Sequence, residues 1–195
     1  MQLRTKTSYE EFPVYLNFKS DLAVDETVSS IVVACVNTAT GVSSSVVASS
    51  SFTAAGRVTL NLDAGVDKEG HKATVTATTS FGQIYEQEVY IAINDEVVSD
   101  SFGIQPNEGI IAAFEFANTI PSGETISTKT MTAIKTSDAS DATATVIKGS
   151  SISGTTVVFK IDDCTAGEVY KVIIKIDTNT AKKYQRNILV SCKEK

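Results

Sequence analysis

An internal repeat with a period of about one hundred residues, the size of a domain, is the feature that most limits how this chain can fold. Residues 12–29 match residues 110–127, and later segments match at an offset that is one residue longer. Matched pairs include Phe18 and Phe116, Glu26 and Glu124, Lys72 and Lys171, Thr79 and Thr178, and Tyr85 and Tyr184. This period is too long for a solenoid repeat. We therefore predict two copies of one module, at residues 1–96 and 97–195.

Short runs of alternating apolar residues dominate both copies, a pattern typical of half-buried β-strands. In residues 12–18 every second side chain is apolar, and residues 110–116 repeat the pattern. Further strand segments are expected at 28–37, 45–48, 58–62, 73–77 and 84–93, and in the second copy at 126–135, 143–148, 157–161, 172–176 and 184–192. No segment shows a helical period. Six or seven strands per copy, with a turn roughly every ten residues, predict an all-β chain of two tandem β-sandwich domains.

The segment between the copies, residues 94–106, is acidic and short. We interpret it as a linker in which Phe102 and Ile104 pack onto the second domain. It has no flexible glycine repeats, so the sequence predicts a limited hinge rather than a free tether.

Charge and cysteine content argue against several classes of function. The formal net charge is −6 and the lysines and arginines are scattered, so no nucleic acid is expected as a partner. No apolar run reaches the roughly 20 residues of a membrane span, so we expect no membrane partner either. The chain opens on polar residues, so we expect no secretion signal. Cys35, Cys164 and Cys192 do not match between the copies, which favours free thiols and synthesis in a reducing cytoplasm.

His71 is the only histidine and the first candidate for chemistry. Its counterpart in the second copy is Tyr170, within a segment similar to the tyrosine corner of sandwich domains, where the hydroxyl ties a loop to the backbone. We therefore interpret His71 and Tyr170 as structural corner residues. A single histidine without further ligands at suitable spacing is weak evidence for a metal.

No other group predicts catalysis, a cofactor or a metal. The aspartates after the alternating strands lack the regular spacing of a calcium loop; they are Asp63, Asp67, Asp162 and Asp163. Glu26 and Glu124 are matched carboxylates, but each belongs to its own domain and is expected to hold a turn. No serine lies in a nucleophile elbow. We predict no catalytic, cofactor-binding or metal-binding residues.

Two equivalent hairpin tips, at residues 80–83 and 179–182, are the candidate docking loops. Gly82 can supply the positive φ angle that such a turn needs. Phe81 and Gln83 form the more apolar tip, whereas Lys182 and Lys183 make the other one charged. A large apolar residue at a tip suits a docking contact. Packing of Phe81 on a neighbouring loop is the alternative interpretation.

Three segments of the second copy carry a resemblance to a known family: residues 123–127 (Gly-Glu-Thr-Ile-Ser), 150–154 (Ser-Ser-Ile-Ser-Gly) and 166–172 (Ala-Gly-Glu-Val-Tyr-Lys-Val). The first copy keeps residues 25–29 and 50–52 but has His71 at the corner. The chain resembles the small immunoglobulin-like domain of tailed-phage virion proteins known as fiber-tail adaptor or neck-associated proteins. The resemblance covers nearly the whole chain and implies two tandem immunoglobulin-like β-sandwich domains.

The resemblance also implies a role. It suggests a non-enzymatic structural virion protein at the head–tail neck or collar, present in many copies in a symmetric assembly. Its expected partners are other virion proteins: portal or connector, tail, collar fibres or capsid. Two alternatives are a capsid decoration or head-fibre protein and a glycan-binding adhesion module. The absence of tryptophan disfavours the last of these.

Overall fold

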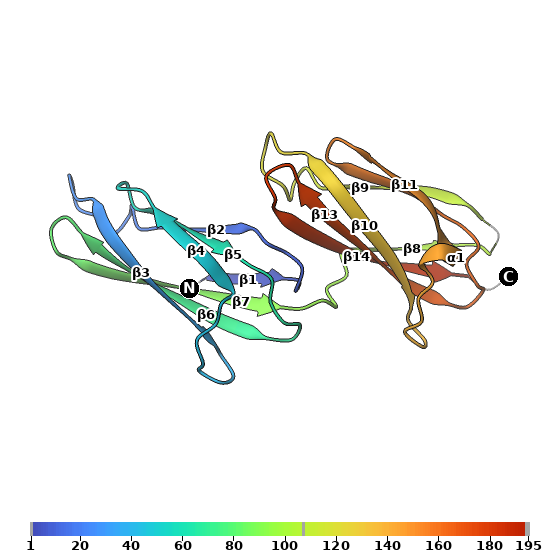
Figure 1. Cartoon of the computed structure of the whole chain (residues 1–195), viewed down its shortest axis with the longest axis horizontal. Helices are drawn as coiled ribbons and strands as arrows, with labels where there is room; N and C mark the ends of the chain where they lie inside the picture. The colour runs from blue at the N-terminus through green and yellow to red at the C-terminus, as the bar shows by residue number, and fades with distance from the viewer. Residues whose placement is uncertain (1, 107, 194–195) are drawn as a thin grey trace. The chain divides into compact units, whose positions relative to one another are not determined.

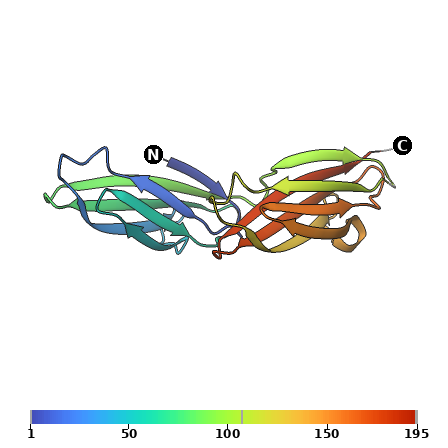
Figure 2. The ribbon, with the colours of Figure 1, turned by 90° about the horizontal axis from the view of Figure 1, so that it is seen from above.

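A computed structural model of the chain describes residues 2–106 and 108–193. The chain divides into two compact units, Met1–Asp95 (unit 1) and Glu96–Lys195 (unit 2). Each unit consists of two packed β-sheets (Figure 1), and the two layers of each unit are also visible in the view of Figure 2.

Unit 1 contains seven strands: β1 (Gln2–Lys6), β2 (Pro13–Asn17), β3 (Val28–Asn37), β4 (Val47–Phe52), β5 (Arg57–Leu62), β6 (Gly70–Thr79) and β7 (Ile84–Ile93). One sheet has the order β1-β7-β6-β3 and the other the order β2-β5-β4. All neighbours pair antiparallel except β1, which runs parallel to β7. Strands 2, 5 and 4 facing strands 7, 6 and 3 give the strand order of an immunoglobulin sandwich.

Unit 2 repeats this topology with one added helical turn. Its elements are β8 (Asp100–Ile104), β9 (Ile110–Glu115), β10 (Ile126–Lys135), α1 (Thr143–Val146), β11 (Ile147–Ser153), β12 (Thr156–Ile161), β13 (Val169–Thr178) and β14 (Lys183–Cys192). The sheets have the orders β10-β13-β14-β8 and β11-β12-β9, and β8 runs parallel to β14. The prediction of two tandem immunoglobulin-like β-sandwiches is therefore confirmed.

The alternating runs of the sequence become the inner faces of the two sheets. In β6 and in β13 every second residue is buried, as the pleat of a strand requires. Phe18 and Phe116, which match in the repeat, are both fully buried. Burying one such side chain contributes up to about 3 kcal/mol. The repeated positions are thus mainly those that build the core.

Several segments differ from the sequence prediction. No strand was expected at Gln2–Lys6, where β1 lies, and the strand expected at residues 45–48 lies at Val47–Phe52. Residues 143–148, expected as a strand, begin with the helical turn α1, and β11 starts only at Ile147. The Asp141 carboxylate accepts the backbone N–H of Thr143, and the N–H of Val146 bonds to the carbonyl of Ala142, so local hydrogen bonds close the turn. Residues 100–104, assigned to the linker, form β8 and pair with β14. Ile104 is buried there, as expected for a residue that packs onto the second domain.

The connection between the units is anchored on both sides. The Asp95 carboxylate accepts hydrogen bonds from the backbone N–H and the hydroxyl of Ser8 in unit 1. In unit 2 the fully buried Asn187 donates from its side-chain amide to the backbone carbonyl of Val97, and the backbone carbonyl of Asn187 accepts the N–H of Ser99. Only Glu96 lies between Asp95 and Val97 in the sequence.

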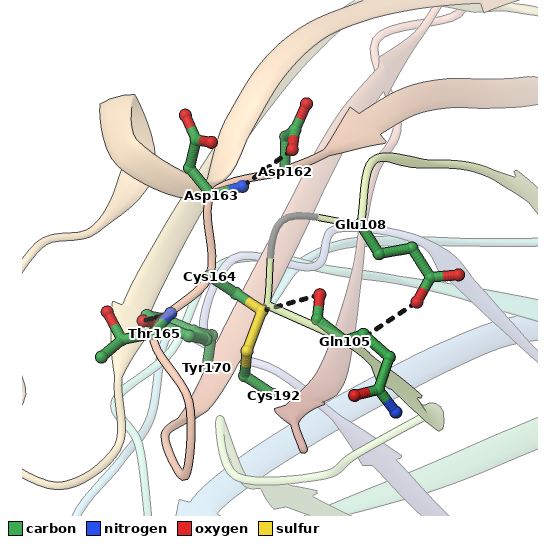
Figure 3. The surroundings of a disulfide bond; sticks show 8 residues. All are labelled: Gln105, Glu108, Asp162, Asp163, Cys164, Thr165, Tyr170 and Cys192. Carbon is green, nitrogen blue, oxygen red and sulfur yellow. Dashed lines mark hydrogen bonds between the residues drawn. A yellow bond between two sulfur atoms is a disulfide. The ribbon is translucent and has the colours of Figure 1, made fainter. Parts of the chain in front are cut away.

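The cysteines differ from the expectation of three free thiols. Cys164 and Cys192 form a disulfide in unit 2, with their Cα atoms 5.9 Å apart, and Cys35 is a free thiol. The bond joins the loop after β12 to the last residue of β14 (Figure 3). The prediction of three free thiols was wrong because it compared the copies and found no matching cysteine pair in unit 1.

Unit 1 fills the equivalent junction, between the loop after β5 and the end of β7, in another way. The counterparts of Cys164 and Cys192 are Gly65 and Ile93. A Cβ atom on Gly65 would lie 2.0 Å from the Ile93 Cδ1, so the isoleucine side chain occupies the space that a side chain at residue 65 would need. One copy therefore packs the junction with an apolar side chain where the other has a covalent bond.

We predict that the disulfide stabilises unit 2 alone. The cross-link spans 28 residues, and loop closure of that size contributes roughly 3 kcal/mol. Calorimetry of the full chain carrying Cys164→Ala and Cys192→Ala should show one transition shifted to lower temperature and the other unchanged. Cys35→Ala is the matched control and should leave both transitions near their original temperatures. Equal shifts of both transitions would contradict the prediction.

Candidate docking site

Three loops meet at one end of unit 1: residues 18–27 between β2 and β3, 53–56 between β4 and β5, and 80–83 between β6 and β7. We call this the unit 1 loop end. Backbone hydrogen bonds join the loops, from Phe18 N–H to the Gly56 carbonyl at 2.8 Å and from Ser80 N–H to the Thr27 carbonyl at 2.8 Å. The three loops therefore form one continuous surface.

Glu26 holds the longest of these loops in place. Its buried carboxylate accepts the N–H of Ala23 at 2.8 Å and the hydroxyl of Thr79 at the end of β6. The Thr79 hydroxyl also accepts the N–H of Gln83, which closes the β6–β7 hairpin. Gly82 adopts φ +78°, as the sequence predicted for this turn. A single carboxylate and a single hydroxyl thus fix two loops against each other.

Large apolar side chains are displayed on and beside this end of unit 1. Val24 is 87% exposed, Phe81 58% and Ile84 68%. Val24 also lines a shallow hollow, together with Lys19, Leu22, Ala23, Glu26 and Ala55. Because the loops are tied by internal hydrogen bonds, the apolar groups can be buried by a partner at a small cost in loop ordering.

The equivalent end of unit 2 is polar. The counterparts of Val24, Phe81 and Ile84 in the repeat are Ser122, Thr180 and Lys183. Of the described residues, nine large apolar side chains are exposed in unit 1 and three in unit 2, two of which lie beside the connection. The two copies have kept the same core and diverged at this surface.

Glu124, the counterpart of Glu26, is used differently in unit 2. Its carboxylate pairs with the Lys182 ammonium and accepts the hydroxyl of Thr180 at 2.6 Å. Burial alone would raise the pKa of Glu124, but the hydrogen bonds from Lys182 and from the hairpin threonines outweigh it and hold the net pKa below its ordinary value. The unit 2 hairpin is therefore held by an ion pair.

The four residues predicted for docking fall into two groups. Phe81 and Gln83 are exposed at the unit 1 loop end. Lys182 is half-buried and its ammonium pairs with Glu124, so it lies against its own unit. Lys183 is half-buried at the start of β14. Val24 and Ile84 were missed, although their polar counterparts in the second copy were a signal in the sequence.

The predicted corner residues occupy equivalent places at the starts of β6 and β13. The hydroxyl of Tyr170 accepts the N–H of Thr165 at 3.0 Å, five residues earlier in the chain (Figure 3). This is the geometry of a tyrosine corner. His71 is also buried, and its Nε2 lies 3.3 Å from a Glu69 carboxylate oxygen.

Charge also differs between the units. Residues 1–95 contain six Lys or Arg and eleven Asp or Glu, giving a net charge of −5, whereas residues 96–195 contain eleven and twelve, giving −1. In the described ranges no three His, Cys, Asp or Glu side chains gather as metal ligands would. None of the helical residues described forms a segment long and apolar enough to cross a membrane.

Two sandwiches of immunoglobulin topology in tandem place the chain among proteins built from repeated immunoglobulin-like modules. A family described as podophage GP4 fiber-tail adaptor protein gp77 matches residues 6–92 and again residues 105–191. The matches cover most of both units, and the chain belongs to this family. It is thus a structural phage adaptor protein. A search of curated proteins finds no match.

The chain is similar to several solved structures at low sequence identity. The titin domains Z1Z2 in complex with telethonin are 10% identical, with 99% of this chain and 92% of that chain covered and a TM-score of 0.33. The Ig1-2 module of the Drosophila receptor protein tyrosine phosphatase DLAR is 12% identical, with 98% and 95% covered and a TM-score of 0.30. These scores add nothing to the fold assignment, which rests on the strand order.

The Glu124–Lys182 pair predicts a pH-dependent stability of unit 2. The pKa of Glu124 is lowered in the folded state, so folded unit 2 binds this proton more weakly than the unfolded chain does. The stabilisation is present above the ordinary carboxyl pKa of 4.5 and is lost as the pH falls through the lowered value. Lys182→Met should cost about 1 kcal/mol at neutral pH and much less in acid.

Urea unfolding of the full chain at both pH values measures this difference. Gln83→Met, at the same place in the unit 1 hairpin, is the matched control and should change stability little at either pH. A loss in Lys182→Met that is equally large in acid would rule out the ion pair as its cause.

Proposed function

We propose that the chain is a non-enzymatic adaptor at the head–tail neck or collar of the virion, bridging the connector to the tail or its fibres. The family match supports an adaptor, and the observation that carries the mechanism is the contrast between the two loop ends. An adaptor must hold different neighbours, and a duplicated module can do so through surfaces in which its copies differ.

In this proposal unit 1 docks through its loop end. Val24, Phe81 and Ile84 supply the apolar contacts, with Gln83 at their border. An aromatic side chain buried at the centre of a contact contributes more than its neighbours do. The surplus of negative charge in unit 1 favours a partner surface that is apolar with a basic border. Unit 2, nearly neutral and polar at its own loop end, then provides the second attachment.

Phe81→Ser in the full chain tests the docking surface. We expect incorporation into virions to fall by about tenfold, the loss typical of an interface anchor. Val66→Ser is the matched control, because Val66 is equally apolar and exposed but lies in the loop between β5 and β6, at the other end of unit 1. Variant and wild-type chains compete in one assembly reaction, and mass spectrometry of purified particles gives their ratio. Equal incorporation of Phe81→Ser and wild type would exclude this surface.

The neck location has a separate test in the copy number. A ring of symmetric subunits at the neck contains on the order of a dozen copies, whereas a capsid surface protein is present in numbers on the order of hundreds. Quantitative mass spectrometry of purified virions against the portal protein should give the smaller number. The larger number would assign the chain to the capsid surface and leave the docking proposal to be judged by Phe81→Ser.

A further inference from the structure

The outer edge of β3 in unit 1 carries backbone groups that no described strand pairs with. β3 is the last strand of its sheet, and only its inner edge pairs with β6. Near its end, the Asn37 N–H bonds to the Val42 carbonyl and the Cys35 carbonyl accepts the Ser44 N–H, so a local hairpin covers that part of the edge. Backbone groups two residues apart point to the same side of a strand. The backbone groups of Ile31 and Val33 therefore face away from β6. They lie in the part of the edge that the hairpin leaves uncovered, residues 30–34, which we call the open part.

The open part of this edge, residues 30–34, has none of the features that usually prevent strand addition. The ten residues of β3, Val-Ser-Ser-Ile-Val-Val-Ala-Cys-Val-Asn, contain no charge and no proline. Natural proteins protect long edge strands with lysine, proline, bulges or inward-pointing charges. The single bulge in β3 lies before Ser30, outside the open part. Val32 at its centre is 68% exposed.

The second copy protects the same edge. In β10 the counterpart of Ile31 is Lys129, whose ammonium donates to the Ser150 hydroxyl on β11 at 2.6 Å. The lysine thus lies on the core side of an edge strand, where an added strand would have to bury its charge. Ile31 instead packs partly against the unit 1 core. The two modules differ in this respect although their strands have the same length.

The open part of the β3 edge is complementary to itself. If two copies of β3 run antiparallel about Val32, Ile31 of each copy lies opposite Val33 of the other, and these residues exchange the outward-facing hydrogen bonds. Val32 then faces Val32 as a non-hydrogen-bonded pair, the closer of the two pair types, and Ser30 faces Ala34. No like charges meet. A two-fold axis satisfies both copies with the same patch.

We propose that the β3 edge is a site at which a second copy of this chain adds, joining two four-stranded sheets into one. The uncharged edge argues for this occupant, since another acidic unit 1 can approach it without a charge directly opposite. The net charge of −5 on each unit 1 opposes the approach at long range, so the association strengthens as salt is added. The proposal does not depend on the adaptor role.

Sedimentation of the full chain over a range of concentrations tests the proposal. Wild type should form a dimer whose dissociation constant falls with added salt. Val32→Lys places like charges opposite each other across the axis and should weaken the dimer by roughly a hundredfold or more. Thr130→Lys is the matched control, because Thr130 is the exposed counterpart of Val32 in β10, and it should leave the dimer unchanged.

A cross-linking experiment tests the register. In a Cys35→Ala background, Val32→Cys should form a disulfide-linked dimer on mild oxidation, whereas Thr130→Cys should not. A wild-type chain that stays monomeric at all concentrations overturns the proposal, as does a dimer that Thr130→Lys weakens as much as Val32→Lys. If the chain is monomeric and Val32→Lys nevertheless prevents incorporation into virions, the edge receives a strand from a different virion protein, and the second-copy proposal is wrong.

Discussion

Burial of alternating side chains between two sheets is the constraint on which the rest of the structure depends. Phe18 and Phe116 are fully buried at equivalent places, and the inner faces of β6 and β13 are filled by every second residue. A core of this kind is sensitive to small changes in side-chain volume. Duplication therefore preserved the inner faces, and the two units differ where a side chain can change without disturbing the packing.

The same reasoning explains what could be predicted from the sequence. Period-two patterns and a domain-sized repeat identify the residues that form the core, so the two sandwiches and most of their strands were predictable. The turn at Gly82 was predictable from the glycine itself. The strands β1 and β8 were not, because each pairs parallel with the last strand of its unit and much of each is exposed. The disulfide was missed because the comparison of the two copies looked for cysteines at matching positions. It assumed that both copies join the loop to the last strand in the same way. Gly65 and Ile93 in one copy, and Cys164 and Cys192 in the other, are different solutions to one packing problem.

Prediction of the candidate site was limited by how side chains pair. Phe81 could be identified as a tip residue, but Lys182 could not be distinguished from a displayed charge without knowing that Glu124 lies beside it. Glu26 and Glu124 are the same residue in the repeat and both brace a loop. Glu26 pairs with a hydroxyl and a backbone N–H, and Glu124 with a hydroxyl and a cation. The matched glutamates predicted a structural role, whereas the nature of each loop end depended on their neighbours.

The two surfaces proposed for contacts lie on different parts of unit 1 and need different partners. The loop end presents side chains, so a partner there must supply a complementary apolar surface. The β3 edge presents backbone groups at Ile31 and Val33, so it can receive only another extended strand. Occupation of one does not consume the groups used by the other. A chain that uses both could pair with its own copy through backbone hydrogen bonds and still offer two loop ends to the particle. Linked attachments of this kind bind more tightly than either loop end alone.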